Sequence, residues 1–264
     1  MTCILVTGGT GTLGRLVVPR LRSAGCQVRV LTRKAPAPAD TVDGIEYVTG
    51  DLAAGTGIDA AVTGADVIVH CAGTSKDDDV KTRALTDAVR RAAPEPPPHL
   101  VFISVVGADR VPVRGALDRA TFGYFASKRA AEVVVTESGL PWTTLRATQF
   151  HELILTVAKA MTKLPVIPAP AGFRFQPVAA AEVADRLSEL ALGSPAGLVP
   201  DMAGPKVYRV PELIRGYLGA AGKRRPLIPL WVPGGAARAV RGGANLAPDQ
   251  AIGKQTWEEF LAQL

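Results

Sequence analysis

The chain contains 264 residues with a mass of 27.6 kDa, of which 47% are hydrophobic and 5% aromatic. This composition excludes an intrinsically disordered chain. The length is enough for one large α/β domain, or for a core domain with a smaller appendage. A net charge of +6, spread along the chain, favours an anionic ligand. The compact basic cluster Lys223-Arg224-Arg225 is interpreted as a solvated turn, so no nucleic-acid partner is expected.

The cysteines and histidines show no redox or metal-binding spacing. Cys3, Cys26 and Cys71 lack a C-x-x-C arrangement, and the three histidines form no ligand pattern. We therefore expect a reduced, metal-free, cytoplasmic protein. A strand is predicted within three residues of Met1, which leaves no room for a signal peptide, and no apolar run reaches the roughly 18 residues of a membrane span. No membrane partner is expected.

Strand-like apolar runs alternate with helix-periodic stretches through the first 150 residues. The predicted strands are Cys3–Thr7, Gln27–Leu31, Ile45–Val48, Asp66–Cys71, His99–Ser104 and Trp142–Arg146. The predicted helices are Thr12–Ala24, a short segment near Gly57–Val62, Val80–Ala92 and Phe122–Ser138. Because each crossover between parallel strands needs a helix to cover a sheet face, the alternation predicts an α/β fold, a Rossmann-type doubly wound parallel sheet.

The pattern changes after residue 150, where prolines interrupt short predicted strands. An Ala-rich helix is predicted over about Ala179–Leu192 and a strand near Leu198–Met202. Further helices are predicted near Pro211–Ala221, Gly235–Val240 and Thr256–Leu264. We expect one domain over residues 1–150 and a smaller C-terminal region over 151–264, with the alternative that 179–202 returns to the main sheet.

A glycine-rich segment follows the first predicted strand and opens the first predicted helix. Gly9-Thr-Gly11-Thr-Leu-Gly14 fits the pattern G-x-G-x-x-G, and the same segment read from Gly8 gives Gly8-x-x-Gly11-x-x-Gly14. Glycines here allow a tight turn, let a pyrophosphate reach backbone N–H groups and permit close packing of helix on strand. We therefore predict a dinucleotide site at the loop residues Gly8, Thr10, Gly11, Thr12, Leu13 and Gly14.

The end of the second predicted strand indicates which dinucleotide binds. An NAD site usually has an Asp or Glu about 20 residues beyond the glycines, where it holds the ribose hydroxyls. This chain has Arg33 and Lys34 there, with no acid before Asp40. The guanidinium fork of Arg33, backed by Lys34, can pair with a 2′-phosphate. The sequence therefore predicts NADP (NADPH) over NAD, with exposed loop charges as the alternative interpretation.

Two further strand ends are predicted to line the same crevice. Asp51 and Leu52 follow the third strand, where an acid can accept a hydrogen bond from an adenine amine or cap a helix. Ala72 and Gly73 follow the fourth strand, where small residues leave space for a ribose. We expect all four residues to contact the cofactor.

Tyr124 and Lys128 occupy positions i and i+4 of a predicted helix in the stretch FGYFASKRAAEVVV. That spacing places the two side chains on one face of the helix. A phenol is a weak acid at neutral pH, and a neighbouring ammonium favours its ionised form, which suits proton exchange. Ser104, at the end of the fifth strand, adds a hydroxyl at the same crevice. A tyrosine in the core with a solvated lysine is the alternative.

These motifs resemble the short-chain dehydrogenase/reductase superfamily, and specifically its atypical NmrA-like branch of NAD(P)-binding proteins. The resemblance covers about residues 1–185 and rests on Thr7-Gly-Gly-Thr-Gly-Thr-Leu-Gly14, Gly50-Asp-Leu52, Phe102-Ile-Ser-Val-Val-Gly107, Tyr124-Phe-Ala-Ser-Lys128 and Ser138-Gly-Leu-Pro-Trp-Thr-Thr-Leu-Arg-Ala-Thr-Gln-Phe150. Two features depart from classical members. Cys71 stands where classical members carry an asparagine of the proton relay. Ser104 and Tyr124 are twenty residues apart in the sequence, which is farther than in classical members.

The resemblance implies an NAD(P)-binding Rossmann domain over residues 1–150 and a substrate region over 151–264. It implies that Tyr124 is the general acid, that Ser104 orients a carbonyl and that Lys128 also binds the nicotinamide ribose. It further implies that the nicotinamide and substrate space is lined by the cofactor residues Ala147 and Thr148 and by the substrate residues Gln149, Phe150 and His151. For Phe150 and His151 a core role is the alternative.

Two functions of different class follow from these observations. The first is an NADPH-dependent oxidoreductase that transfers a hydride to a carbonyl, quinone or enone of a small hydrophobic substrate, with either a monomer or a homodimer possible. The second is a non-catalytic NAD(P)H-sensing regulatory protein, favoured by the missing asparagine. Sugar-nucleotide epimerase or dehydratase chemistry uses the same Tyr124 and Lys128, but the C-terminal portion is short for holding a second nucleotide.

Overall fold

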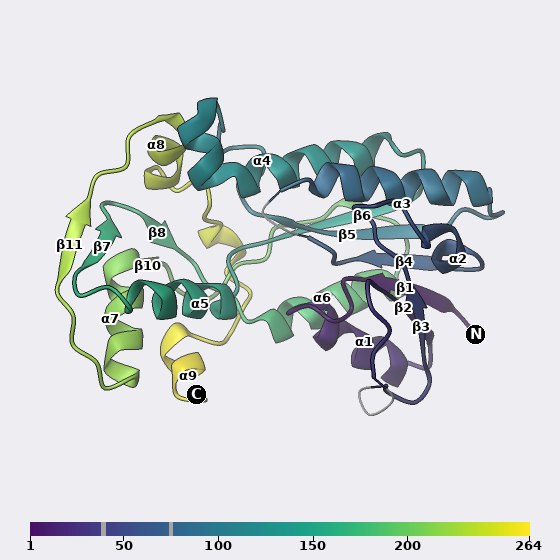
Figure 1. Ribbon diagram of the computed structural model, residues 1–264, viewed down its shortest axis with the longest axis horizontal. Coiled ribbons are helices and arrows are strands. Elements are labelled where there is room, and N and C mark those ends of the chain that lie inside the picture. The colour runs from purple at the N-terminus through teal and green to yellow at the C-terminus, as the bar shows by residue number, and fades with distance from the viewer. Residues whose placement is uncertain (38–40, 74–75) are drawn as a thin grey trace. The chain divides into compact units, whose positions relative to one another are not determined.

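The computed structural model describes residues 1–37, 41–73 and 76–264 (Figure 1), so Asp40 lies outside the described residues. The chain divides into two compact units, each assembled from three segments. Unit 1 comprises Met1–Ser104, Ser127–Leu145 and Val183–Val199, and unit 2 comprises Val105–Ala126, Arg146–Glu182 and Pro200–Leu264. Both units therefore take segments from both sides of residue 150.

Unit 1 is built on a seven-stranded parallel sheet with the strand order β3-β2-β1-β4-β5-β6-β9. Its strands are β1 (Cys3–Thr7), β2 (Gln27–Thr32), β3 (Ile45–Thr49), β4 (Val67–His70), β5 (His99–Val105), β6 (Trp142–Ala147) and β9 (Gly197–Leu198). The order reverses between β1 and β4, which is the switch point of a doubly wound sheet, where ligands bind beyond the carboxyl ends of the strands. The predicted Rossmann-type fold is confirmed.

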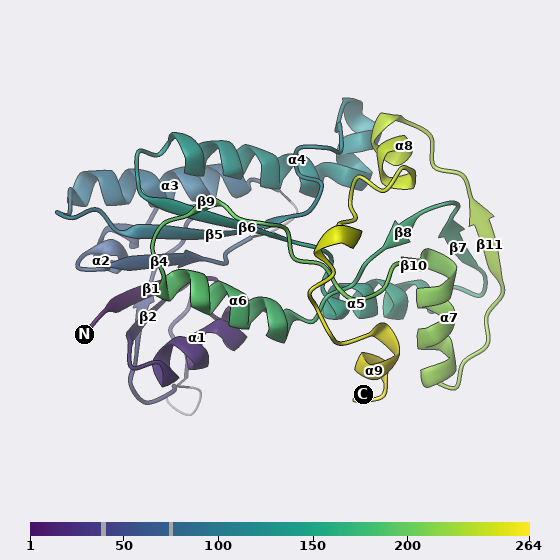
Figure 2. The same cartoon turned by 180° about the vertical axis from the view of Figure 1, so that it is seen from behind.

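Helices cover both faces of this sheet, as Figures 1 and 2 show. On one face lie α1 (Gly14–Ser23) and α6 (Ala180–Leu192), and on the other lie α3 (Asp78–Ala92) and α4 (Gly115–Glu137), with the short α2 (Ile58–Val62) packed against α3. Apolar side chains of β1, β4 and β5 pack against these last three helices. The core on that face contains Leu5, Ile58, Ile68, Leu85, Phe102 and Val135, all 2% exposed or less. This packing fixes the strand ends that carry the site.

Residues 179–202, for which the sequence allowed either the C-terminal region or the main sheet, return to the main sheet. α6 leads into β9, and β9 pairs in parallel with β6 through Thr143–Gly197 and Thr144–Leu198. The strand is shorter than the predicted Leu198–Met202 because Pro200 has no N–H to donate to a ladder.

Two helices begin earlier than predicted. α3 begins at Asp78 and not at Val80, and α4 begins at Gly115 and not at Phe122. The first turns of α4 are mostly exposed, so they carry no apolar periodicity that a sequence pattern could show. Asp118 accepts a hydrogen bond from the N–H of Arg114 at 3.1 Å, a contact at the helix start that the apolar pattern does not encode.

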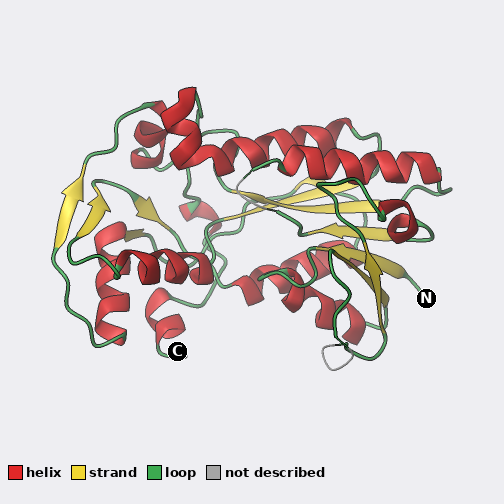
Figure 3. Cartoon of the chain, in the orientation of Figure 1, coloured by secondary structure: helices red, strands yellow, loops and turns green. Residues whose placement is uncertain are grey.

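Unit 2 combines helices with two small two-stranded sheets, β7 with β11 and β8 with β10 (Figure 3). Its elements after β6 are α5 (His151–Met161), β7 (Ile167–Pro170), β8 (Arg174–Phe175), β10 (Tyr208–Arg209), α7 (Val210–Ala220), β11 (Leu227–Leu230), α8 (Gly235–Arg241), a 3₁₀ turn (Pro248–Gln250) and α9 (Trp257–Leu261). The short strands expected where prolines interrupt this region are present as β7 and β8, whereas α5 was not predicted. The run Leu153–Val157 mixes apolar and β-branched residues, which suit a strand equally well.

Candidate functional site

The glycine-rich loop connects β1 to α1 through a tight turn. Gly8 has a positive φ of 69°, and its carbonyl accepts a hydrogen bond from the N–H of Gly11 at 2.9 Å. A Cβ on Gly8 would lie 2.7 Å from the backbone nitrogen of Ala72, and a Cβ on Gly14 would clash with the Gly8 carbonyl oxygen. The chain therefore has room only for glycine at both positions, and the N-terminus of α1 stays close to the strand ends.

A cavity of about 420 Å³ in unit 1 opens beside this loop. Its walls come from the ends of β1, β2, β3 and β4, which parallel pairing brings to one edge of the sheet. The predicted cofactor residues that line it are Gly8, Thr10, Gly11, Arg33, Lys34, Asp51, Leu52, Ala72 and Gly73. Further lining residues, not predicted from the sequence, are Thr7, Leu31, Thr32, Gly50, Ala53, Cys71 and Lys81. Thr12, Leu13 and Gly14 do not line it but lie in the turn that begins α1.

The cavity carries more positive than negative charge. Arg33 and Lys34 are exposed just beyond β2, and within the described residues no hydrogen bond or ion pair engages the Arg33 guanidinium. Lys81 contributes a third cation from α3. A diphosphate with an additional phosphate fits this combination of backbone N–H groups, guanidinium and ammonium groups. The cavity therefore fits a phosphate-rich dinucleotide.

Asp51 is the acidic group of the cavity wall. Its Oδ1 accepts a hydrogen bond from the N–H of Ala53 at 2.8 Å, which holds the turn after β3. Asp51 does not cap α2, because the N-cap of that helix is Gly57. The helix-cap alternative is therefore wrong. Among the described residues, no hydrogen bond or ion pair engages the second carboxylate oxygen of Asp51.

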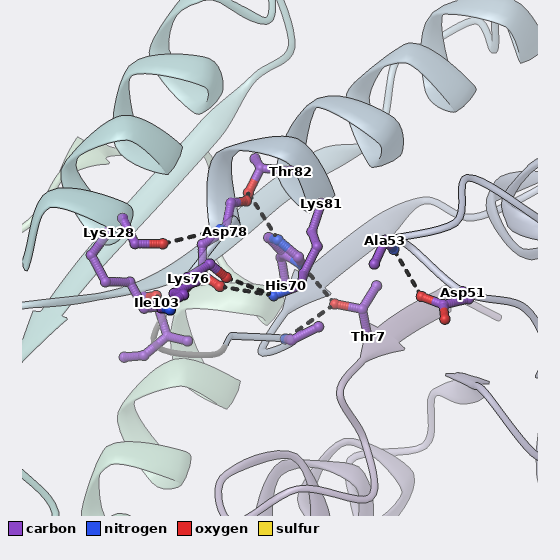
Figure 4. A network of polar contacts seen from close by, with 12 residues as sticks. Thr7, Asp51, Ala53, His70, Lys76, Asp78, Lys81, Thr82, Ile103 and Lys128 are labelled. Carbon is purple, nitrogen blue, oxygen red and sulfur yellow. Dashed lines mark hydrogen bonds and ion pairs between the residues drawn. The ribbon is translucent and has the colours of Figure 1, made fainter. Parts of the chain in front are cut away.

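A buried chain of hydrogen bonds joins β1 to β4 behind the cavity (Figure 4). Thr82 donates through Oγ1 to the carbonyl of Asp78 at 2.6 Å, so its oxygen accepts from Nε2–H of His70 at 3.1 Å. The Nδ1 atom of His70 then accepts from the Thr7 hydroxyl at 2.6 Å, and the Thr7 oxygen accepts from the N–H of Ala72 at 3.4 Å. Burial lowers the pKa of His70 to about 3, so the imidazole stays neutral. The chain fixes the position of Ala72 in the cavity wall.

Lys128 is buried close to this chain of hydrogen bonds (Figure 4). Its Nζ lies 3.2 Å from Oδ2 of Asp78 and donates to the carbonyl of Ile103 at 3.1 Å. The ammonium also lies 5.0 Å from the ring centroid of Phe102. A Cβ on Gly73 would lie 2.7 Å from Nζ, so Lys128 sits directly behind a residue of the cavity wall.

The other predicted catalytic residues lie outside the cavity wall. Tyr124 is 37% exposed and lies four residues before Lys128 on α4. Ser104 is buried, and its hydroxyl donates to Oε1 of Glu132 at 2.6 Å, which leaves no proton to orient a carbonyl. Burial raises the pKa of the Cys71 thiol to about 12, although Lys128 opposes this shift, so Cys71 holds its proton at neutral pH.

The residues predicted around the nicotinamide and substrate belong to unit 2 and are not among the residues that line the described cavity. Ala147 is buried, and Thr148 donates through its hydroxyl to the carbonyl of Gln176 at 2.6 Å. Gln149 is 9% exposed, and neither polar atom of its side chain has a hydrogen-bond partner among the described residues. An unpaired buried amide is costly, so Gln149 keeps the capacity to bind a polar ligand group.

Phe150 and His151 begin α5 and belong to the packing of unit 2. Phe150 is the N-cap residue of α5. His151 is fully buried, stacks on Phe260 at 5.0 Å between ring centroids, and donates from Nε2 to the carbonyl of Gln255 at 3.1 Å. Burial lowers the pKa of His151. The surroundings of His151 match the core alternative that the sequence left open.

None of the helices among the described residues combines the length and the apolar character needed to cross a membrane. In the same residues, no group of three or more His, Cys, Asp or Glu side chains is arranged to hold a metal ion.

Comparison with known sequences finds relatives that are longer than this chain. An uncharacterized protein of Mycobacterium tuberculosis is 27% identical over 232 residues, which cover 87% of this chain and 24% of that protein. The (4-alkanoyl-5-oxo-2,5-dihydrofuran-3-yl)methyl phosphate reductase of Streptomyces griseus is 31% identical over 172 residues, which cover 64% of this chain and 55% of the reductase. This chain thus spans about a quarter and about half of their respective lengths.

Solved structures with the same fold include enzymes of two kinds. An NADPH-dependent quinone oxidoreductase of Escherichia coli, complexed with NADPH, has a TM-score of 0.78 and 19% identity, with 98% of this chain and 99% of that chain covered. A UDP-glucose 4-epimerase of Thermus thermophilus, complexed with NAD, has a TM-score of 0.71 and 19% identity, with 99% and 98% covered. At these identities the similarity establishes the fold alone.

The comparison with family models agrees with the cavity described above. The model described as NAD(P)H-binding matches residues 8–191, a range that begins at Gly8 of the glycine-rich loop and ends in α6. The match contains every residue found in the cavity wall except Thr7. The chain belongs to the NAD(P)H-binding family.

Proposed function

We propose that this chain is an NADPH-dependent reductase that acts on a carbonyl, quinone or enone of a small hydrophobic substrate. One observation carries the proposal: the Lys128 ammonium lies directly behind Gly73, so the helix with the Tyr-x-x-x-Lys pair meets the wall of the cofactor cavity. The reductase relative from Streptomyces griseus and the quinone oxidoreductase with the same fold support the reaction class.

The chain's own groups suit the parts of NADPH. Backbone N–H groups of the Gly8–Gly14 loop and of the N-terminus of α1 bind the diphosphate bridge, apart from the Gly11 N–H, which donates to the Gly8 carbonyl. Arg33 pairs with the 2′-phosphate through its planar fork, and Lys34 adds charge there. Asp51 accepts from the adenine amine. NADH lacks the 2′-phosphate, so these two cations would favour NADPH.

The bound nicotinamide supplies the hydride. Tyr124 donates its phenolic proton to the substrate oxygen as charge develops on that oxygen, and Lys128 stabilises the phenolate that remains. Lys128 also binds the nicotinamide ribose. Ser104 is left out of this machinery because its one proton already goes to Glu132. Gln149, whose buried amide has no hydrogen-bond partner among the described residues, is the residue we assign to the polar end of the substrate.

NADPH oxidation tests the proposal when it is followed with a panel of quinones, enones and aldehydes. Removing the phenol in Tyr124→Phe should lower kcat by about 100-fold or more, the range of general acid catalysis, while the NADPH dissociation constant stays unchanged. Tyr47→Phe, in the edge strand β3, is the matched control and should retain full activity. Full activity in Tyr124→Phe would remove this tyrosine from the mechanism.

A second function, NAD(P)H sensing without turnover, is favoured by the state of two side chains. Ser104 has no proton free to orient a carbonyl, and Cys71 keeps its thiol protonated, so neither extends a proton relay from Tyr124 and Lys128. This function predicts tight NADPH binding, no oxidation with any acceptor of the panel, and a protein partner retained only when cofactor is present.

A further inference from the structure

Asp78 occupies a buried position between α3 and α4. It is the first residue of α3, it is fully buried, and its N–H donates to the Ser127 hydroxyl at 3.0 Å. A carboxylate is favoured at a helix N-terminus, where the helix dipole is positive. This position directs Asp78 at Lys128, the residue next to Ser127 on α4.

The Asp78 carboxylate lies between two ammonium groups (Figure 4). Its Oδ2 is 3.2 Å from Nζ of Lys128, and its Oδ1 is 3.3 Å from Nζ of Lys81. Lys128 is 3% exposed, and a buried ammonium is strongly destabilised unless a carboxylate compensates it. Asp78 supplies that compensation, so one carboxylate serves a lysine of the cavity wall and the lysine of the Tyr-x-x-x-Lys pair.

Gly73 links this ion pair to the cofactor cavity. It lines the cavity, and a Cβ on it would lie 2.7 Å from Nζ of Lys128 and 3.1 Å from Oδ2 of Asp78. The Lys128 ammonium and the Asp78 carboxylate therefore lie next to Gly73 of the cavity wall. A lateral movement of the Lys128 ammonium would change the position of the positive charge beside the site of a bound ribose.

We propose that Asp78 is a positioning residue, which acts through Lys128 by holding its ammonium charged and in place behind Gly73. This inference rests on the proposed reductase function for its catalytic consequence. The ion pair itself is independent of turnover. Asp78 does not touch the reacting atoms, so its contribution is confined to the charge state and location of Lys128.

Other titratable groups face Lys128 or lie near it along its helix. From β4 and the loop after it come His70, neutral because burial lowers its pKa to about 3, and Cys71, whose thiol pKa burial raises to about 12. On α4 itself, Tyr124 lies one turn before Lys128 and Glu132 one turn after it. Asp78 and Lys81 are thus the charges that α3 contributes, one stabilising the Lys128 ammonium and the other opposing it.

Two substitutions with opposite expected signs test the proposal. The readout is the pH at which Lys128 loses its proton, followed by the ¹³C NMR signal of its Cε in protein labelled with ¹³C-lysine and assigned with Lys128→Met. Asp78→Asn removes the compensating charge and should lower this pH by about 1 unit or more. Lys81→Met removes the competing cation and should raise it. Asp79→Asn, the adjacent carboxylate on α3, is the matched control and should leave it unchanged.

The pH dependence of the reductase reaction provides the catalytic arm. In Asp78→Asn the alkaline limb of the kcat profile should move toward acid together with the NMR transition, and Asp78→Glu should restore part of the difference. A merely structural role for Asp78 would lower stability without moving this limb. If Asp78→Asn does not fold, the test relies on Lys81→Met, which should raise the pH at which Lys128 loses its proton.

The two proposals fail in different ways. A Lys128 transition that stays in place in folded Asp78→Asn, or in Lys81→Met, overturns the role of Asp78 whatever the activity. Absence of NADPH oxidation with every acceptor, combined with the expected NMR changes, overturns the reductase function and retains Asp78 as the residue that holds Lys128.

Discussion

The backbone of Gly8 approaches the backbone of Ala72 so closely that a Cβ on Gly8 would lie 2.7 Å from the Ala72 nitrogen. This approach brings the glycine-rich loop after β1 and the cavity wall after β4 together at the point where the strand order reverses. The neighbouring Thr7 and His70 hold the same two strands by a hydrogen bond of 2.6 Å. The site therefore depends on backbone proximity before any charged side chain contributes.

Gly8→Ala should weaken NADPH binding by about tenfold or more, because the Ala72 backbone cannot yield as a flexible side chain can. The positive φ of Gly8 adds strain of its own, so the control must share it. Gly55→Ala has the same φ of 69° and no atom within 4 Å of the added Cβ. Calorimetric titration with NADPH and thermal unfolding of both variants separate the close approach from the φ strain. Equal NADPH affinities in the two variants would contradict the crowded turn.

Arg33→Met should lower NADPH affinity by about 10-fold to 100-fold, the range of a charge-assisted hydrogen bond, and leave NADH affinity nearly unchanged. The reason is that only NADPH has a phosphate for the Arg33 fork. Methionine keeps the apolar stem, which isolates the guanidinium. Titration of each coenzyme measures the ratio, with the exposed Arg224→Met as control. An equal loss for both coenzymes would place Arg33 at the diphosphate and not at the 2′-phosphate.

Ser104→Ala should lower the free energy of unfolding by about 1–3 kcal/mol, because it removes the donor to the buried Glu132 carboxylate. The effect on kcat should be much smaller. Ser188→Ala is a matched buried control whose hydroxyl donates to a carbonyl of its own helix, and it should cost less. Urea unfolding and steady-state kinetics measure the two quantities. A large loss of kcat at unchanged stability would return Ser104 to the catalytic role that its position after β5 suggested.

The free energy of unfolding should fall by about 2 kcal/mol between pH 7 and pH 5 through His70 alone. In the unfolded chain the imidazole has its ordinary pKa of 6.5, whereas burial lowers the pKa of His70 in the folded protein to about 3. The contribution is therefore complete above 6.5 and is lost as the pH falls toward 3. His70→Gln removes the titration and should flatten this slope. Burial also lowers the pKa values of His99 and His151, but these act equally in both proteins. If urea unfolding gave the same pH dependence of the unfolding free energy for the wild-type protein and for His70→Gln, the role of His70 would be refuted.

The elements that line the cavity were predictable because their signals are local. The Gly8–Gly14 loop, Arg33 and Gly73 each follow an apolar strand, and parallel strands place their carboxyl ends at one edge. Asp78 and Lys81 were missed. The apolar period of α3 starts at Val80, which left Asp78 in a predicted loop, and a lysine three residues into a helix is typical of a solvated surface.

The sequence by itself determined the doubly wound sheet, the glycine turn and the basic end of β2, since strand periodicity, glycine freedom and residue charge are properties of short segments. Only the tertiary structure decided the partners of buried polar groups: Ser104 with Glu132, Lys128 with Asp78, and the His151 ring against Phe260. Those partners come from elements 28, 50 and 109 positions apart in the chain, and no local pattern specifies which distant group compensates a charge removed from water.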